Sequence, residues 1–109
     1  MSNYSHKKLE KFIQDTFQKM GYDEPMAVLA AKVLISADLR GVDSHGVARL
    51  SGYVRLWEAN RINSNPDIKV TYETPSTAVV DGDAALGLVV GPKAMEVAIE
   101  KAKNVGTGW

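Results

Sequence analysis

The chain of 109 residues contains no cysteine, and this absence excludes a disulfide framework, a thiol nucleophile and a zinc site with thiolate ligands. Histidine is scarce as well. Only His6 and His45 offer an imidazole, and neither has a second ligand at metal-binding spacing, so we expect no metal site. Neither sign of charge is in excess, because 13 Lys and Arg balance 13 Asp and Glu. No overall field therefore favours nucleic acid or an anionic membrane as a partner.

Long apolar runs are also missing. No segment is apolar over the roughly 20 residues that a membrane helix needs, and residues 1–11 lack the apolar centre of a signal peptide. We therefore expect a cytoplasmic protein without a membrane partner. What is present is a hydrophobic content of 45%, which is ordinary for a globular chain.

The first sixty residues show helical periodicity in three segments. Apolar residues at three- and four-residue spacing predict a helix over residues 6–20. The sequence Asp-Glu-Pro at residues 23–25 is typical of a helix start, and it opens a second helix that reaches about Arg40. A third helix is predicted over residues 44–59. Its apolar stripe consists of Val47, Leu50, Val54 and Trp57.

Beyond this helical region the apolar period changes to two. Residues 60–67 are rich in turn formers and are interpreted as a linker. Alternating side chains over residues 68–72 and 78–80 then predict a β-hairpin, with its turn at residues 74–76.

A fourth helix is predicted from between Gly87 and Pro92 to about Asn104. It is apolar over more than half of its circumference, which predicts burial against a sheet on one side and another element on the other. Residues 105–109 are interpreted as a glycine turn followed by the first large apolar residue of a new strand. Because a hairpin and one helix leave much apolar surface without a partner, we expect the chain to be the N-terminal piece of a longer protein.

These elements predict an α+β fold, within an α/β fold for the longer protein. Residues 1–62 are expected to form a three-helix subdomain. Residues 63–109 are expected to begin an α/β subdomain that binds cofactor and substrate.

The segment ADLRGVDSHGVAR, residues 37–49, gathers an unusual density of chemically capable side chains. Gly41 is predicted to stop the second helix in the left-handed conformation. Asp43 or Ser44 is predicted to cap the third helix. His45 would then lie in the first turn of that helix, at the positive end of its dipole.

His45, Arg49 and Tyr53 follow one another at four-residue spacing, so they are predicted to share one face of the third helix. An imidazole, a guanidinium and a phenol at a helix N-terminus can hold and protonate a small anion. The structural alternative is that Ser44 is only a cap, His45 an exposed first-turn residue and Arg49 a solvated charge. Spacing alone leaves both interpretations open.

Three glycines, Gly82, Gly87 and Gly91, follow the predicted hairpin and precede the fourth helix. Their spacing matches neither the Rossmann fingerprint nor a P-loop, so we interpret them as turn glycines and a loose helix start. The sequence identifies no cofactor-binding residue.

A different functional class is a helix-turn-helix module that binds nucleic acid. Residues 33–56 would supply two helices around a short glycine turn, and four arginines lie in or near them. Acidic residues are interspersed among these arginines, however, and the net charge is zero where phosphate binding needs a basic face. Nucleic-acid binding, or a non-catalytic interaction module, is therefore the alternative to an enzyme.

The segment ADLRGVDSHGVARL, with Tyr53-Val54 shortly after it, resembles the N-terminal signature of the malate/L-lactate dehydrogenase family. This family is distinct from the Rossmann-type lactate dehydrogenases and includes ureidoglycolate dehydrogenase, 2,3-diketogulonate reductase and sulfolactate dehydrogenase. The similarity extends over nearly the whole chain, through Gly21, the alanine-rich second helix, Val80-Asp81-Gly82 and the alanine-rich fourth helix.

The resemblance implies interconversion of 2-hydroxy and 2-keto acids with NAD or NADP, on a nicotinamide-binding fold that is not Rossmann, in a homodimer. It implies His45 as the proton donor, with Ser44 and Arg49 beside the substrate. Family members continue beyond the position of Trp109 into a strand and an Asn-x-x-His motif, whose histidine has the acid/base role in other members. Which histidine carries the proton stays open, and we expect these 109 residues to be inactive alone.

Overall fold

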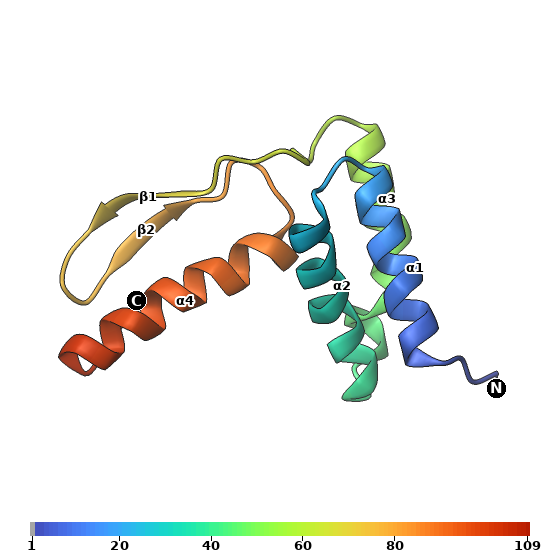
Figure 1. The fold of residues 1–109 in the computed structure, drawn as a ribbon, viewed down its shortest axis with the longest axis horizontal. Helices are drawn as coiled ribbons and strands as arrows, with labels where there is room; N and C mark the ends of the chain where they lie inside the picture. Colours follow the sequence, from blue (N-terminus) through green and yellow to red (C-terminus); the bar gives the residue numbers. More distant parts are fainter. Residues whose placement is uncertain (1) are drawn as a thin grey trace.

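A bundle of three helices at one end and a hairpin with a long helix at the other make up the computed structural model, which describes residues 2–109 (Figure 1). The predicted α+β class is confirmed, because these residues form four α-helices and one two-stranded sheet. The molecule measures 48 × 31 × 22 Å and has a radius of gyration of 15.4 Å. A compact domain of this length would have a radius of gyration of about 13 Å. The excess arises because the hairpin and the last helix project from the bundle as an arm.

The bundle contains α1 (His6–Lys19), α2 (Glu24–Leu39) and α3 (Leu50–Glu58). The first two helices confirm the predicted ranges to within one residue. Gly21 follows α1 with a φ of +108°, a left-handed conformation that glycine adopts without steric cost. Asp23 caps α2 as expected, because its Oδ1 accepts a hydrogen bond from the Met26 amide at 2.9 Å. Gly41 follows α2 with a φ of +76°, also as predicted.

The core of the bundle lies between α1 and α2. Alanines on α2 present little side chain, so the larger residues of α1 reach the α2 backbone closely. The fully buried residues of these two helices are Ile13, Phe17, Ala27, Ala30, Ala31 and Leu34. Phe12 of α1 is apolar and at helical spacing from Leu9, but its side chain is 59% exposed.

The third helix does not begin where the sequence predicted it. Two short 3-10 helices come first, Asp43–His45 and Val47–Arg49, and α3 starts only at Leu50. The cause is Gly46, which lies between the two short helices with φ −97° and ψ −141°, outside the helical region.

The predicted cap of this segment is also wrong. Neither Asp43 nor Ser44 accepts a backbone hydrogen bond through its side chain at the start of the segment. The cap comes instead from the end of α2, where Asp38 Oδ2 accepts a hydrogen bond from the Val47 amide at 2.7 Å.

The arm begins with the predicted hairpin, formed by β1 (Lys69–Glu73) and β2 (Ala78–Asp81). The strands are antiparallel, with Lys69 opposite Asp81 and Glu73 opposite Ala78. The register is irregular between Val70 and Tyr72, as in a β-bulge. A hairpin therefore forms as expected, but its first strand is exposed along its whole length.

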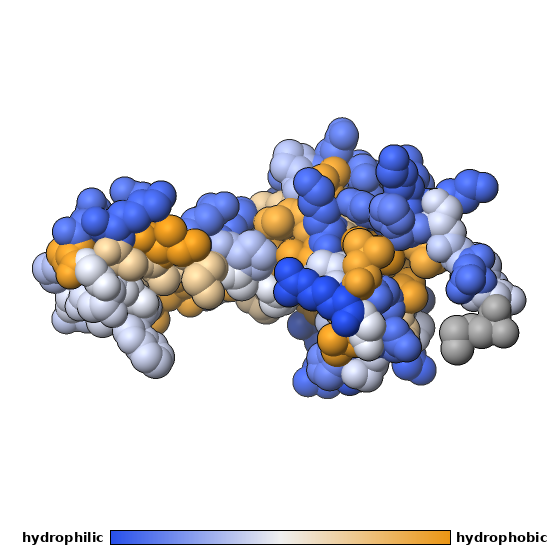
Figure 2. Space-filling model, turned by 90° about the horizontal axis from the view of Figure 1, so that it is seen from below, coloured by the Kyte–Doolittle hydropathy of each residue, from blue (hydrophilic) through white to orange (hydrophobic). Residues whose placement is uncertain are grey.

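The remaining element is α4 (Gly87–Val105), and its expected burial on two sides is wrong. Among its apolar residues only Val89 is fully buried, while Met95 is 59% and Ile99 47% exposed. Within residues 2–109, α4 contacts two other elements, the strand β2 and the helix α2. Figure 2 shows the apolar surface that results on this arm.

Residues 60–67 connect the bundle to the arm, and hydrogen bonds fix their position. The Tyr22 hydroxyl donates to the Asn63 carbonyl and accepts from the Leu86 amide, each at 3.0 Å. Asp83 Oδ2 accepts from Asn63 Nδ2 at 3.0 Å and from the Asp67 amide at 2.9 Å. The subdomain boundary at residue 62 stays a prediction.

The last residue pairs with the hairpin. The Trp109 amide donates to the Ser76 carbonyl at 2.8 Å, and the Trp109 carbonyl accepts from the Ala78 amide at 2.7 Å. Two such bonds on either side of one residue have the geometry of a parallel pairing, although the sheet of the described residues contains only β1 and β2 and the predicted strand stays a prediction. Gly108 lies against α4, where a methyl group would overlap the carbonyl of Ala98. Within the described residues, no helix is long and apolar enough to cross a membrane.

Candidate functional site

His45, Arg49 and Tyr53 line one open cavity of about 590 Å³, although they do not share a helix face. His45 ends the first 3-10 helix, Arg49 ends the second, and Tyr53 lies in α3. Their convergence therefore depends on the fold of the 43–49 segment. The other lining residues are Gly52, Arg55, Leu56, Ala59 and Arg61.

Ser44 does not line the cavity, but it forms hydrogen bonds with two residues that do, His45 and Arg49. Its Oγ lies 2.8 Å from Nδ1 of His45, within hydrogen-bond distance. Because Nδ1 is engaged, Nε2 is the ring nitrogen left for another partner. The Ser44 carbonyl accepts a hydrogen bond from Nε of Arg49 at 2.7 Å. This bond leaves the two terminal NH₂ groups of Arg49 able to bind an anion side by side.

Tyr53 is fixed through its ring. The ring centroid lies 6.4 Å from that of Phe17, which is fully buried in the bundle core, and the two planes are tilted by 54°. Aromatic pairs at this distance contribute to packing beyond the area they bury. The Tyr53 ring is thus positioned by packing against the core residue Phe17.

Asp38 and Gly46 also shape this site, although the sequence pattern did not indicate them. Asp38 holds the Val47 amide, and a methyl group on Gly46 would overlap the Asp38 carboxylate. The two residues together fix the path of the chain between His45 and Arg49. The available signal was an acidic side chain in the last turn of a mostly apolar helix.

Arg55 and Arg61 were also missed as cavity residues, since the sequence offered them only as phosphate contacts. With Arg49 they bring three guanidinium groups to the lining, which contains no Asp or Glu. In the part of the chain that the structure describes, every ion pair uses a lysine and none uses an arginine. The cavity is therefore cationic in a chain of zero net charge.

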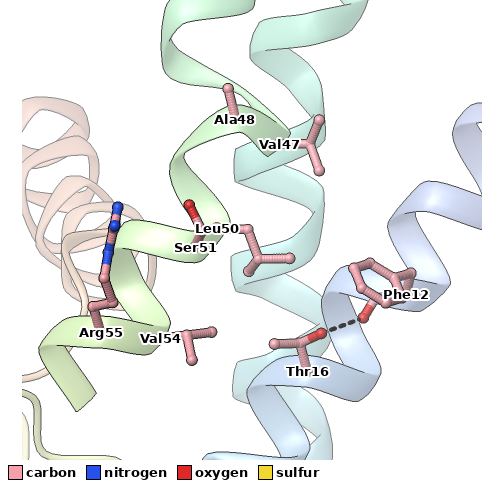
Figure 3. A pocket seen from close by; sticks show the side chains of 8 residues that line it. All are labelled: Phe12, Thr16, Val47, Ala48, Leu50, Ser51, Val54 and Arg55. Carbon is pink, nitrogen blue, oxygen red and sulfur yellow. Dashed lines mark hydrogen bonds between the residues drawn. The ribbon is translucent and has the colours of Figure 1, made fainter. Parts of the chain in front are cut away.

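A second cavity, of about 610 Å³, lies between α1 and α3 (Figure 3). Phe12 and Thr16 line it from α1, and the Thr16 hydroxyl donates to the Phe12 carbonyl at 2.8 Å. The facing side chains are largely apolar: Val47, Ala48, Leu50, Ser51, Val54 and Arg55. Without converging polar groups this cavity is poorly suited to a small charged substrate.

The turn that follows the hairpin does not have the form of a phosphate-binding glycine turn. Gly82, the first glycine after the hairpin, faces the side chain of Val90, which a methyl group would meet at 3.0 Å, so it allows close packing and not the approach of a phosphate. In residues 2–109 no three acidic or imidazole side chains lie close enough together to hold a metal ion.

The fold and the first cavity define a class: an α+β module with an open cavity that a guanidinium and an imidazole both line. The sequence model of the malate/L-lactate dehydrogenase family matches residues 4–109. The chain belongs to this family of oxidoreductases, as the DSHG segment indicated.

Similar proteins include the L-sulfolactate dehydrogenase of Methanocaldococcus jannaschii, which is 50% identical over 91% of this chain and 29% of its own length. The malate dehydrogenase of Pyrococcus abyssi is 48% identical over 93% of this chain and 28% of its own length. The solved structure of malate dehydrogenase from Pyrococcus horikoshii OT3 superposes with a TM-score of 0.93 and 44% identity. That match covers 98% of this chain and 31% of the solved chain. The chain thus spans less than a third of the length of these relatives.

The helix-turn-helix interpretation is not favoured. The relatives are hydroxyacid dehydrogenases. In addition, residues 43–49, which would open the recognition helix, form two 3-10 helices, and the α-helix that follows has only 9 residues.

Proposed function

We propose that this chain supplies the acid-binding part of an NAD- or NADP-dependent dehydrogenase that interconverts 2-hydroxy and 2-keto acids. One observation carries the proposal: His45 and Arg49 line the same cavity, and Ser44 contacts both. The names of the relatives, which act on malate and sulfolactate, support this substrate class.

The roles follow from the chemistry of each group. Oxidation of a 2-hydroxy acid removes a hydride from C2 and a proton from the hydroxyl, leaving a carbonyl. Nε2 of His45 takes that proton in oxidation and returns it in reduction, since an imidazole exchanges protons near neutral pH. The terminal NH₂ groups of Arg49 bind the carboxylate through two parallel hydrogen bonds. The Tyr53 phenol contributes a further hydrogen bond to the bound acid.

The hydride partner in this proposal is NAD or NADP, as the family resemblance implies. We assign no residue of this chain to that cofactor, and the roles proposed for these residues are binding of the acid and movement of its proton. The proposal includes two further predictions. The full-length enzyme is a cytoplasmic homodimer, and the 109 residues alone do not catalyse the reaction.

The proposal is tested in a chimera in which this chain replaces the corresponding segment of Pyrococcus horikoshii malate dehydrogenase. We expect His45→Ala to lower kcat by about a hundredfold or more with little change in KM, the usual size of general acid–base catalysis. Arg49→Lys should chiefly raise KM, because a lysine cannot bind a carboxylate through a planar fork.

Arg40→Gln is the matched control, since Arg40 lies outside the cavity lining, and it should change neither constant. If an active chimera keeps its kcat within a few-fold after His45→Ala, another histidine moves the proton and the proposal is wrong.

A further inference from the structure

Two segments connect the bundle to the arm, residues 60–67 and residues 82–86, and together they are called the junction here. Leu86 and Val89, at the base of α4, belong to the same buried cluster as the bundle core. Beyond this base the arm extends away from the bundle (Figure 1). The orientation of the arm therefore depends on the junction and on the burial of these two side chains.

The two segments of the junction are bonded to each other. The Asn63 amide donates to the Ala84 carbonyl at 2.9 Å. Asp83 Oδ2 accepts from Asn63 Nδ2 at 3.0 Å and from the Asp67 amide at 2.9 Å. One carboxylate oxygen thus holds two points of the first segment against the second.

The junction backbone takes conformations that ordinary residues avoid. In the described residues three non-glycine residues have a positive φ, and all three lie in the junction: Asn60 at +57°, Asp83 at +50° and Ala84 at +56°. A left-handed conformation is unfavourable for a residue with a Cβ, and it persists where surrounding contacts hold it. The hydrogen bonds of Asp83 and Ala84 supply such contacts. The junction therefore has a defined conformation, unlike a flexible linker.

Tyr22 connects the junction to the aromatic residues behind the acid-binding cavity. Its side chain is buried, and its hydroxyl donates to the Asn63 carbonyl and accepts from the Leu86 amide. The Tyr22 ring meets the Phe17 ring edge-on, at a centroid distance of 6.4 Å and an interplanar angle of 77°. Phe17 in turn packs against Tyr53 of the cavity lining. A continuous series of packed rings therefore runs from the cavity to the start of α4.

From these contacts we infer that Asp83 and Tyr22 are positioning residues, which hold the bundle in one orientation relative to the arm, and that turnover of the acid requires this orientation. The inference rests on the proposed function, because it takes the cavity of the bundle as the place of the reacting acid.

The physical reason is the precision that hydride transfer demands. The reacting atoms must be held about 3–3.5 Å apart, and a misplacement of about 1 Å can lower the rate by about a hundredfold. In the chimera described above, the chain leaves the bundle for the rest of the dehydrogenase through the arm. A loosened junction would therefore displace the bound acid without changing any group that binds it.

The orientation is measured first, in the 109-residue chain. Because the chain contains no cysteine, Lys32→Cys on α2 and Asn104→Cys on α4 place two spin labels at exposed positions on the bundle and the arm. Pulsed electron paramagnetic resonance, on labelled protein diluted with unlabelled protein, gives the distribution of distances between them. We expect a narrow distribution for the parent chain and one about twice as wide or more for Asp83→Gly. Glycine tolerates the positive φ but lacks the carboxylate, so this change removes the hydrogen bonds and keeps the backbone allowed.

Three further variants complete the comparison. Asp83→Asn is the conservative change and should keep the distribution narrow, because an amide oxygen can accept the same two hydrogen bonds. Tyr22→Phe removes the bridging hydroxyl and should widen the distribution. Asp23→Ala is the matched control, since it removes a helix cap within the bundle and leaves the junction intact, so the distribution should stay narrow.

Turnover is then measured in the chimera. Asp83→Gly should lower kcat at least about tenfold and leave KM for the acid within about twofold, because the cavity that binds the acid is unchanged. Asp83→Asn should recover most of kcat, and Asp23→Ala should change neither constant. This division between kcat and KM, together with the recovery by asparagine, is not expected of a residue that only stabilises the fold.

Other outcomes contradict the inference. It fails if the distribution of Asp83→Gly is as narrow as that of the parent, because Asp83 then does not hold the orientation. It also fails if the distribution widens while kcat is unchanged, or if Asp23→Ala lowers kcat as much as Asp83→Gly does. A chimera that loses kcat with His45→Ala but keeps it with Asp83→Gly supports the proposed function and overturns this inference. If kcat withstands His45→Ala, the proposed function is wrong and the inference falls with it.

Discussion

At the scale of single residues, the site depends on a contact between Gly46 and Asp38. The Asp38 carboxylate occupies the space where a side chain at position 46 would begin, and from there it accepts the hydrogen bond of the Val47 amide. A glycine is needed for this close approach and not for a left-handed backbone, because φ at Gly46 is −97°. The bond fixes the chain between His45 and Arg49.

We expect Gly46→Ala to lower the free energy of unfolding by about 1–3 kcal/mol, the usual cost of overpacking a filled site. Urea denaturation followed by circular dichroism measures the loss. The matched control is Gly52→Ala, which has open space for the added methyl group and should stabilise α3 by up to about 1 kcal/mol.

The same contact allows a test by double substitution. In an Asp38→Ala background the overlapping carboxylate is gone, so Gly46→Ala should cost less there than in the wild type. Equal costs in the two backgrounds would show that the glycine is required for another reason.

Tyr22 is the residue that joins the bundle to the arm, and its hydroxyl is satisfied on both sides. Tyr22→Phe should lower the free energy of unfolding by about 1–3 kcal/mol, because the Leu86 amide is then left buried without an acceptor. Chemical denaturation at neutral pH measures the loss. No loss would mean that water replaces the hydroxyl at the Leu86 amide.

This residue also predicts a pH dependence. Burial raises the pKa of the Tyr22 phenol above its ordinary value, although the hydrogen bond from the Leu86 amide lowers it. Because the folded state then holds the proton more tightly than the unfolded state, stability is retained below the unfolded pKa of about 10 and is lost as the pH rises past it. The stability gap between wild type and Tyr22→Phe should therefore narrow above pH 10. A gap that is constant to pH 11 contradicts the assigned burial effect.

How far the sequence predicts the site differs from residue to residue. It led to His45, Arg49 and Tyr53, which the structure brings to one cavity. It did not lead to Arg55 and Arg61, since their place in the lining depends on where α3 begins and on the reversal after it. The catalytic and binding roles of these residues stay predictions until activity and binding are measured.

At the scale of elements, the helices were predicted best where local signals and packing agree. Asp23 supplies a cap and α2 an apolar face, and the observed helix starts where both indicate. The start of α3 was missed because the relevant signal is not local. The cap that organises residues 43–49 comes from Asp38 on the preceding helix. A four-residue spacing within that segment was read as one helix, although Gly46 interrupts it.

The cap of α2 gives a prediction at this scale. Asp23→Ala removes the acceptor of the Met26 amide and should lower the free energy of unfolding by about 1 kcal/mol, whereas Asp23→Ser should keep most of the cap. Thermal unfolding of the three proteins measures the order. If alanine and serine cost the same, the side-chain hydrogen bond does not contribute to stability.

At the scale of the whole molecule, the bundle and the arm differ in how much apolar surface they bury. The bundle encloses a continuous core, while α4 and the hairpin pack against each other along one side only. The large exposed apolar residues of the arm are Val70, Tyr72, Val79, Met95, Ile99, Val105 and Trp109. The sequence predicted this unpartnered surface, because a hairpin and one helix cannot bury all of their apolar side chains. The predicted burial of α4 on two sides was too extensive.

An exposed apolar surface of this kind promotes self-association and binds hydrophobic dyes. We expect the 109-residue chain to enhance the fluorescence of such a dye and to sediment as more than a monomer at high concentration. The double substitution Met95→Lys and Ile99→Lys should reduce both effects without loss of helix content, because these side chains are already about half exposed. Phe12→Lys is the control at the other end of the molecule, where Phe12 is also exposed but lines the cavity between α1 and α3. If the dye signal falls with Phe12→Lys and persists in the α4 variant, the dominant apolar surface belongs to that cavity. The arm would then be less available to a partner than its exposed side chains indicate.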